Sequence, residues 1–245
     1  AQQLGGYFGM VKRLDEALGR MRDALKSLDM ADNTVILFTS DHGNHFKTRN
    51  PEYKRSCHEA SVRVPTAFCG PGFDGRGRVN QQVSLLDLPP TLLDAAGIDI
   101  PETMEGRSIL PLLNGGDPDW PEEAFIQISE SQIGRALRTK RWKYSVSAPG
   151  KSGWEEPASD EYVEEYLYDL DADPYELQNL IGREPYVEVA EALRARLIER
   201  MVAAGEKAPV IHPAERRRGG QRALSIDDVR SRYIDKPGAG INRVG

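Results

Sequence analysis

Six consecutive β-prone residues, Thr34-Val35-Ile36-Leu37-Phe38-Thr39, restrict the fold of this chain more than any other feature of its sequence. The run does not alternate between apolar and polar residues, which is typical of a strand buried on both faces of a parallel sheet. Before it, apolar residues between Tyr7 and Leu28 recur every three or four positions among charged ones, as in an amphipathic helix. Helix, short loop and buried strand together predict half of a doubly wound α/β unit.

The segment after this strand, Ser40-Asp41-His42-Gly43-Asn44-His45, is where we expect functional side chains. In open α/β sheets, ligands bind beyond the carboxyl ends of the strands. An aspartate at that place is a natural metal ligand. From the Asp-His-Gly triplet alone, an aspartate that caps the next turn beside an exposed histidine is an equally good interpretation.

Further elements are expected in the first half of the chain. Residues 62–68 end at a Gly-Pro-Gly turn and indicate a strand. Residues 85–96 indicate a helix with Pro89 and Pro90 in its first turn or at a kink, and Gly97 as its C-terminal cap. The turn-rich segment 114–119 is a candidate boundary, which makes residues 1–119 part of an α/β core.

A smaller α+β subdomain is expected at residues 120–208. Strand-like runs at 124–129, 135–146 and 166–170 have no crossover helix between them, which indicates a small antiparallel sheet. An apolar stripe over residues 184–204 predicts one helix that covers a face of this sheet. Residues 209–245 lack periodicity, so we expect an extended tail that is ordered only where it packs on the body.

Composition excludes several classes of protein. The 245 residues include 32 Lys and Arg against 38 Asp and Glu, a net charge of −6, so phosphate neutralisation gives no general attraction to nucleic acid. No apolar stretch approaches the ~18 residues of a membrane span, and the first residues do not resemble a signal peptide. Cys57 and Cys69 alone form neither a disulfide framework nor a metal cluster.

Several segments resemble, in order and spacing, the sulfatase family of the alkaline phosphatase superfamily. Asp41-His42-Gly43 is followed by Lys54 at 54 − 41 = 13 positions further on, and then by His58-Glu59-Ala60-Ser61-Val62-Arg63-Val64-Pro65. Residues 83–94, 135–144 and 168–180 agree as well, so the resemblance spans roughly residues 7 to 200. It implies part of an alkaline-phosphatase-like αβα sandwich, followed by a small subdomain with an antiparallel sheet and a helix.

The resemblance also implies parts that this sequence lacks. Sulfatases use a cysteine in a Cys-x-Pro/Ala-x-Arg motif, which is converted to formylglycine, and two further aspartate metal ligands early in the chain. Cys69 is followed by Phe73 where the arginine belongs, and the segment after Cys57 fails at the third position. We interpret both cysteines as small core or strand-end residues. The chain is therefore expected to be the C-terminal half of a sulfatase and inactive alone.

Site roles follow from the resemblance, residue by residue. Asp41 and His42 match metal ligands; calcium is the usual family metal, while an imidazole ligand equally suits manganese or zinc. Lys54 matches the lysine that contacts sulfate oxygens. His45 and Arg49 are candidate substrate contacts, the latter together with Asn50; for His45 a structural role bonded to backbone is as good an interpretation.

Two other sets of residues are expected to be structural or solvent-exposed and not part of the site. His58 stands where many family members carry an aromatic residue, which favours packing over catalysis. The basic strand 138–143 is expected to be a solvated face, with one cation reaching the pocket as the lesser alternative.

The leading hypothesis is hydrolysis of a sulfate ester on a sulfated small molecule or carbohydrate, together with the missing N-terminal half. One alternative is hydrolysis of a phosphate or phosphonate ester, because the same metal and lysine stabilise either tetrahedral anion. The other is a non-catalytic module that binds anions or a partner. The resemblance leaves the compartment undetermined and is compatible with the periplasm or with secretion.

Overall fold

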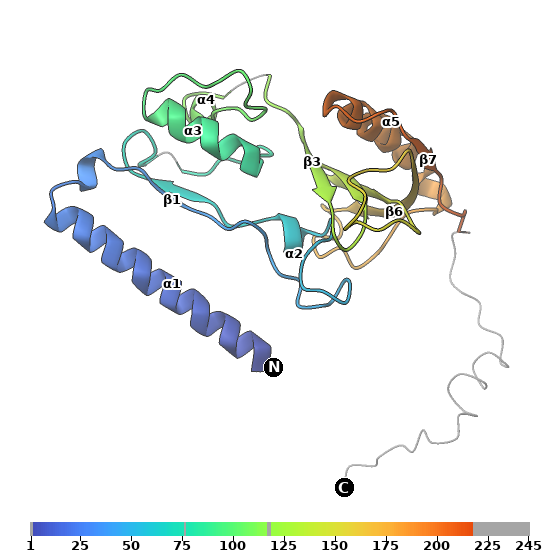
Figure 1. The fold of residues 1–245 in the computed structure, drawn as a ribbon, viewed down its shortest axis with the longest axis horizontal. Coiled ribbons are helices and arrows are strands. Elements are labelled where there is room, and N and C mark those ends of the chain that lie inside the picture. The colour runs from blue at the N-terminus through green and yellow to red at the C-terminus, as the bar shows by residue number, and fades with distance from the viewer. Residues whose placement is uncertain (1, 76, 117–118, 218–245) are drawn as a thin grey trace, which may run out of the picture.

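The computed structural model describes residues 2–75, 77–116 and 119–217, and Figure 1 shows their arrangement. The first region runs from helix α1 to helix α4. Its elements are α1 (Gln2–Ser27), a 3₁₀ turn (Ala31–Asn33), β1 (Ile36–Phe38), α2 (Glu59–Val62), β2 (Ala67–Cys69), a 3₁₀ turn (Leu85–Asp87), α3 (Leu88–Ala95) and α4 (Leu110–Leu113).

The ribbon formed by β1 and β2 lies between helices. Ile36 and Phe38 line one shallow hollow together with Leu18 of α1, whereas Val35 belongs to a core cluster with Leu110 and other residues of α3 and α4. Alternate residues of a strand point to opposite faces, so this division follows from the backbone. The order of helix, ribbon and helix (Figure 1) agrees with the expected αβα arrangement.

The predicted environment of β1 is wrong for this chain. In the part that the structure describes, β1 pairs antiparallel with β2 only, with Ile36 opposite Cys69 and Phe38 opposite Ala67. Phe38 remains 40% exposed. A strand with a single hydrogen-bonded neighbour cannot be buried on both faces and both edges, although its continuous apolar sequence suits such a place.

The second predicted strand is also shorter than expected. Val62 ends helix α2, and β2 starts only at Ala67. Pro65 lies between the two elements and has no N–H to donate to a ladder. The helix predicted over residues 85–96 is confirmed, with a 3₁₀ first turn, prolines in the first turn of α3, and Gly97 at φ +69° just after it.

The second region is a five-stranded sheet with one helix. Its elements are β3 (Glu123–Ile128), β4 (Gly134–Thr139), β5 (Trp142–Ser147), β6 (Glu161–Asp169), a 3₁₀ turn (Glu184–Tyr186), α5 (Val187–Ala203) and β7 (Val210–His212). The strand order is β3-β4-β5-β6-β7, antiparallel except for β7, which runs parallel to β6. The predicted antiparallel sheet is confirmed, with the run 135–146 divided into two strands.

The main core lies between this sheet and α5. Leu193, Leu197 and Met201 of α5 pack against Leu137 and Tyr144 of the sheet, all of them buried. The predicted covering helix is therefore confirmed. The first residues after Pro209 pack on the body as β7, while residues 218–245 of the expected tail lie outside the described part. None of the helices in the described part of the chain has the length and apolar character needed to cross a membrane.

Candidate functional site

Three of the predicted site residues meet at the carboxyl end of β1. Asp41 and His42 follow the strand directly, and Oδ2 of Asp41 lies 3.4 Å from Nε2 of His42. Lys54 lies further along the same loop between β1 and α2, and its Nζ lies 2.9 Å from the same His42 nitrogen. One carboxylate and one ammonium thus both approach the imidazole of His42.

Hydrogen bonds assign the tautomer of His42. Its Nδ1 lies 2.8 Å from the carbonyl oxygen of Gly43, which accepts only, so Nδ1 carries the proton. The ammonium of Lys54 donates only, so Nε2 accepts from it. The ring is therefore neutral, and its lone pair is directed at the place where Lys54 now stands. A neutral imidazole with a bonded far nitrogen is the form in which histidine binds metals.

The backbone of this loop is fixed against α2. The N–H of Gly43 donates to the carbonyl oxygen of Ser61 at 2.7 Å, and Ser40 Oγ donates to the carbonyl of His42 at 2.8 Å. A Cβ at position 43 would lie 2.1 Å from the carbonyl oxygen of Ala60. Only glycine permits this close approach, which sets the direction of the His42 ring.

Asp41 presents its carboxylate to solvent, with the side chain 83% exposed. Removal of some surrounding water raises the pKa of this carboxyl, but the N–H of His42, at 2.9 Å, and the positive charge of Lys54 outweigh that effect. The pKa therefore lies below its ordinary value of 3.8, and the group is an anion at neutral pH. It is free to turn toward a ligand.

The loop that carries Lys54 is braced by Asn50. The Asn50 amide donates to the carbonyl oxygens of Lys54 and Arg55, both at 3.2 Å, and its Oδ1 accepts from the N–H of Glu52 at 2.9 Å. Asn50, predicted as a specificity candidate with Arg49, is thus a structural residue of this loop. Arg55 has φ +61°, a strained conformation that these contacts stabilise.

The two side chains that were predicted to contact substrate, those of His45 and Arg49, form hydrogen bonds with backbone carbonyl oxygens in the structure. His45 is buried, and its Nε2 lies 3.2 Å from the carbonyl oxygen of Lys54, while its Nδ1 has no hydrogen-bond partner among the described residues. Arg49 donates to the carbonyl oxygens of Tyr175 and Glu176, at 2.7 and 2.8 Å. Neither side chain is brought to the Asp41–His42–Lys54 group in this structure.

His58 and the cysteines have packing roles. His58 is buried, and its two ring nitrogens lie 3.2 Å from Ser56 Oγ and 3.1 Å from Tyr168 Oη. Burial, with the charges of Arg49 and Lys143, lowers its pKa from 6.5 to about 3, so it is neutral. Cys57 is buried among apolar residues of the sheet, and burial raises the pKa of its thiol to about 12. Cys69 ends β2 at the opposite end of the ribbon from Asp41.

The basic strand is not a solvated face, contrary to the prediction. Lys143 is fully buried, and its Nζ lies 2.7 Å from Glu59 Oε1 and 2.6 Å from Glu176 Oε1. Arg138 also approaches Glu59, at 3.4 Å. The segment around α2 covers this face of the sheet, and no local pattern predicts that contact.

Sequence reasoning also missed Tyr53, Glu59 and Glu176. The ring of Tyr53 is partly exposed and lies 6.1 Å from the ring of His42, and Lys54 Nζ lies 5.6 Å above it. Tyr53 adjoins Lys54 in the sequence, which is the one signal that pointed to it. Glu59 and Glu176 lie within the segments that carry the family resemblance, without a feature that marks them as site residues.

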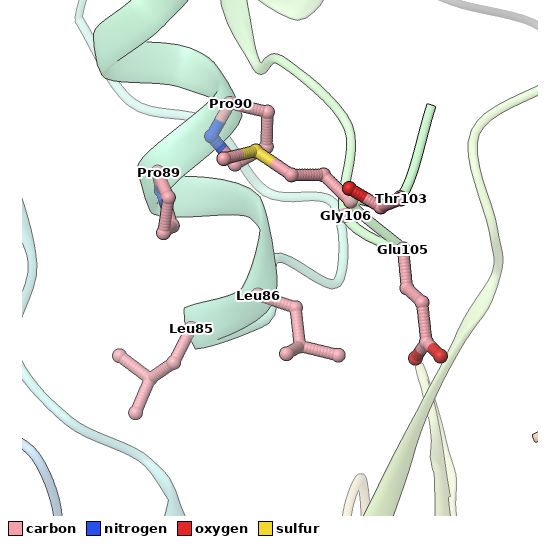
Figure 2. A pocket seen from close by; sticks show the side chains of 8 residues that line it. Leu85, Leu86, Pro89, Pro90, Thr103, Glu105 and Gly106 are labelled. Carbon is pink, nitrogen blue, oxygen red and sulfur yellow. The ribbon is translucent and has the colours of Figure 1, made fainter. Parts of the chain in front are cut away.

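An apolar hollow lies away from the Asp41–His42–Lys54 group. It has a volume of about 430 Å³ and lies between the start of α3 and the loop of residues 103–106 (Figure 2). Leu85, Leu86, Pro89 and Pro90 form its apolar wall, and Glu105 is its one charged lining residue. A negative charge and apolar walls do not suit a sulfate or phosphate group, so this hollow is not the anion site.

Within the part of the chain that the structure describes, Asp41 and His42 are the residues that fit a metal ion. Among the described residues, no group of three or more His, Cys, Asp and Glu side chains could hold a metal ion. Asp41 and His42 still fit as two ligands of a metal ion, because an exposed carboxylate oxygen and a neutral imidazole nitrogen lie 3.4 Å apart. Calcium prefers oxygen donors, so the His42 nitrogen leaves manganese and zinc as equally suitable metals.

Comparison with known proteins identifies two matching family models. The model described as N-sulphoglucosamine sulphohydrolase, C-terminal, matches residues 52–203, and the model described as sulfatase matches residues 1–98. The first model thus covers Lys54, helix α5 and four strands of the sheet, β3 to β6. Arylsulfatase K of the dog, Canis lupus familiaris, is 35% identical over 191 residues, which are 74% of this chain and 34% of that protein.

Solved structures share the fold. A protein solved in complex with its substrate D-glucosamine-2-N,6-O-disulfate is 25% identical, with a TM-score of 0.66 over 81% of this chain and 40% of that one. The phosphonate monoester hydrolase of Agrobacterium radiobacter is 27% identical, with a TM-score of 0.65 over 80% of this chain and 40% of that one. The chain spans about a third of the length of the arylsulfatase K proteins that it matches.

Proposed function

The chain belongs to the sulfatase family of the alkaline phosphatase superfamily, and on this premise we propose that it is the C-terminal part of an enzyme that hydrolyses a sulfate ester. The observation that carries the proposal is the meeting of Asp41, His42 and Lys54 at the end of β1. These three side chains provide two groups that can bind a cation and one ammonium that can bind an anionic oxygen, which is the chemistry that sulfate ester hydrolysis needs.

Asp41 and His42 are proposed to hold a divalent cation together with ligands from outside the described residues. A bound cation of this kind would act as a Lewis acid on the sulfate oxygens. The chain's own contribution is to orient the two side chains. The carbonyl oxygen of Gly43 accepts a hydrogen bond from His42 Nδ1, which fixes the imidazole, and Asp41 Oδ1 accepts from the N–H of His42, which leaves Oδ2 of this exposed carboxylate for a ligand.

Lys54 is proposed to bind the oxygens of the transferred group. As the ester bond breaks, negative charge grows on the sulfate and on the leaving oxygen, and a preorganised ammonium stabilises that charge. The loop holds the carbonyl of Lys54 through Asn50 and His45, while the side chain reaches freely to His42. If His42 Nε2 served as a metal ligand, the ammonium of Lys54 would be free to contact an anion beside it.

The attacking nucleophile is proposed to come from outside this chain. Cys57 is buried with a raised pKa, and Cys69 lies at the far end of the ribbon, so neither reaches the Asp41 group. The relatives are about three times as long as the matched segment, which leaves room for a formylglycine and further metal ligands. The proposal therefore includes a partner segment that completes the site, without which this chain is inactive.

The proposed substrate is a sulfated small molecule or carbohydrate. The structural relative that is bound to a glucosamine disulfate supports this class. Tyr53 supports it as well, because its partly exposed ring stands beside Lys54 and provides an apolar face next to the sulfate. A second candidate is a phosphonate monoester, which the similarity to the Agrobacterium radiobacter hydrolase favours.

Turnover of matched aryl esters tests this proposal. The whole protein should hydrolyse an aryl sulfate with a larger kcat/KM than the corresponding aryl phosphonate. A preference for the phosphonate would select the second candidate, and absence of turnover with both would select a non-catalytic role.

Substitution of Lys54 tests the role of the site. Lys54→Ala in the whole protein should lower kcat by about 10²–10³, the usual cost of removing one charge-stabilising donor, with an unchanged melting temperature. Lys47→Ala is the matched control, because Lys47 is an exposed lysine of the same loop. A kcat of Lys54→Ala within a few-fold of the parent would show that Lys54 does not contact the reacting group.

A further inference from the structure

The segment from Arg49 to Glu59, which carries Lys54 near its middle, is held at both ends by one residue of the C-terminal sheet region. The carbonyl oxygen of Glu176 accepts from Arg49 at 2.8 Å. The carboxylate of the same residue accepts, through Oε2, from the backbone N–H of Glu59 at 2.8 Å. Glu176 therefore fixes the distance between the two ends of this segment.

Glu176 is itself fixed by a buried group of four charges. Its Oε1 lies 2.6 Å from Lys143, which also contacts Glu59 at 2.7 Å, and Arg138 lies 3.4 Å from Glu59. Two carboxylates and two cations compensate one another. Burial alone raises the pKa of Glu59, but the charges and hydrogen bonds of Lys143 and Arg138 outweigh it, so this pKa lies below its ordinary value and the carboxylate stays charged.

The backbone of Glu176 is adapted to this role. Its φ of +55° lies in the left-handed region, which a residue with a side chain seldom adopts and which persists only when surrounding contacts hold it. This conformation lets one residue offer its carbonyl to Arg49 and its carboxylate to Glu59 and Lys143.

Within segment 49–59, hydrogen bonds and an ion pair connect its two ends to the backbone around Lys54. Asn50, next to Arg49, donates to the carbonyl oxygens of Lys54 and Arg55. On the other side, Arg55 pairs with Glu130, and its carbonyl oxygen accepts from Ser131 at 3.0 Å. A shift at either end of the segment is therefore passed to Lys54, which itself makes its contact with His42 in the first region.

We propose that Glu176 is a positioning residue, which holds segment 49–59 on the C-terminal sheet and thereby sets the place of Lys54 relative to Asp41 and His42. The proposal rests on the proposed function only for the role of Lys54 in the reaction. The C-terminal sheet region then contributes to the geometry of the site, although it supplies neither the metal ligands nor Lys54.

The first test is hydrogen exchange of the whole protein with Glu176→Gln, which removes the charge and keeps the shape of the side chain. Exchange should become faster within segment 49–59 and stay unchanged in α5. The matched control is Glu164→Gln, because Glu164 is a carboxylate of the same sheet, equally buried, that pairs with Arg194 and makes no contact with segment 49–59. Arg49→Met releases one end only and should give the same local increase should Glu176→Gln fail to fold.

The second test is a double-mutant cycle on kcat with the whole protein. Because a misplacement of about 1 Å can cost ~10²-fold, Glu176→Gln should lower kcat strongly when Lys54 is present. In the Lys54→Ala background, the same substitution should cost little more, since the residue acts through Lys54. Residues that act independently would multiply their losses instead.

Three results would overturn the proposal: unchanged exchange of segment 49–59 in Glu176→Gln, an equal increase in Glu164→Gln, or the same loss of kcat with and without Lys54. Absence of any esterase activity would instead overturn the proposed function. In that event the exchange experiment alone decides whether Glu176 holds the segment.

Discussion

The two regions of this chain differ in how completely they bury their own apolar surface. In the first region, the apolar face of α1 is exposed along its length, and the ribbon of β1 and β2 has one small buried cluster around Phe73, Ile109 and Trp120. In the second, the sheet and α5 enclose a continuous core. The first region carries Asp41 and His42, and the second holds the loop that carries Lys54.

This difference indicates which region depends on surfaces outside the described chain. Apolar surface that is removed from water contributes about 25 cal/mol per Å² to stability. Helix α1 packs on the ribbon around one small hollow, so it gains little of this stabilisation. In the second region, the core between the sheet and α5 is built from that region alone, whereas the other face of the sheet is covered by segment 49–59. The site therefore joins a sparsely packed region to a well packed one, with segment 49–59 between them.

The largest effect is expected from Lys143→Met. This substitution removes the ammonium that pairs with the buried carboxylates of Glu59 and Glu176. Breaking a buried ion pair typically lowers the free energy of unfolding by about 3–5 kcal/mol. Urea unfolding followed by tryptophan fluorescence measures the loss. Lys140→Met is the control, since Lys140 is exposed at the turn between β4 and β5 and should change stability by less than about 0.5 kcal/mol.

The same substitution in two helices tests the comparison directly. Leu197→Ala in α5 removes a fully buried side chain and should cost about 2–5 kcal/mol. Leu14→Ala in α1 removes a side chain that is 55% exposed and should cost less than about 0.5 kcal/mol in this chain. Urea unfolding of both variants gives the two values. Equal losses would mean that α1 is packed in solution in a way that the structure does not show.

The pH dependence of stability should report His58. Its pKa is about 3 in the folded protein and 6.5 as an ordinary value. Stability is therefore fully present above pH 6.5 and is lost as the pH falls toward 3, because only the unfolded state takes up the proton. At pH 5 the loss amounts to about 2 kcal/mol. His58→Gln should remove this part of the difference between pH 7.5 and pH 5.

The control for this prediction is His212→Gln. His212 is half exposed and lies 3.2 Å from Glu161, so its removal should leave the loss between pH 7.5 and pH 5 almost unchanged. An equal effect of both substitutions would contradict the assignment to His58.

The smallest effect is expected from metal added to the 245-residue chain. Asp41 and His42 supply two ligands, whereas calcium takes ~6–8 oxygens and zinc about four donors. Calorimetric titration with calcium, manganese or zinc should show no submicromolar site. Tight one-to-one binding would mean that other residues of this chain complete the site, and Asp41→Asn would then show whether the predicted ligands take part.

Patterns local in sequence were predicted correctly because their physical causes are local. The stripe of apolar residues at helical spacing located α1 and α5, and prolines with a following glycine located α3 and its end. Strand-like runs without a crossover helix located the antiparallel sheet. The family spacing also predicted that Asp41, His42 and Lys54 belong to one site, and the structure brings them together because hydrogen bonds of His45 and Asn50 fold the loop between β1 and α2 back on itself.

Contacts between distant segments were not predictable in this way. Lys143 looks like a surface residue of a basic strand, and only the packing of segment 49–59 on the outer face of the sheet buries it. Arg49 looks like a substrate contact because it stands near Lys54 in sequence, yet its guanidinium binds the carbonyls of the turn at residues 175–176. Neither partner is marked by spacing or composition.

Helical periodicity, strand propensity and motif spacing are properties of neighbouring residues, so they were enough to predict α1, α3, α5, most of the antiparallel sheet and the family, and to place Asp41 at the end of β1. Three features appear only in the folded chain: the antiparallel pairing of β1, the burial of the basic strand and the contacts of Glu176 with the segment that carries Lys54. The reason is physical: burial and charge compensation depend on which surfaces meet, and two surfaces meet only once the whole chain has folded.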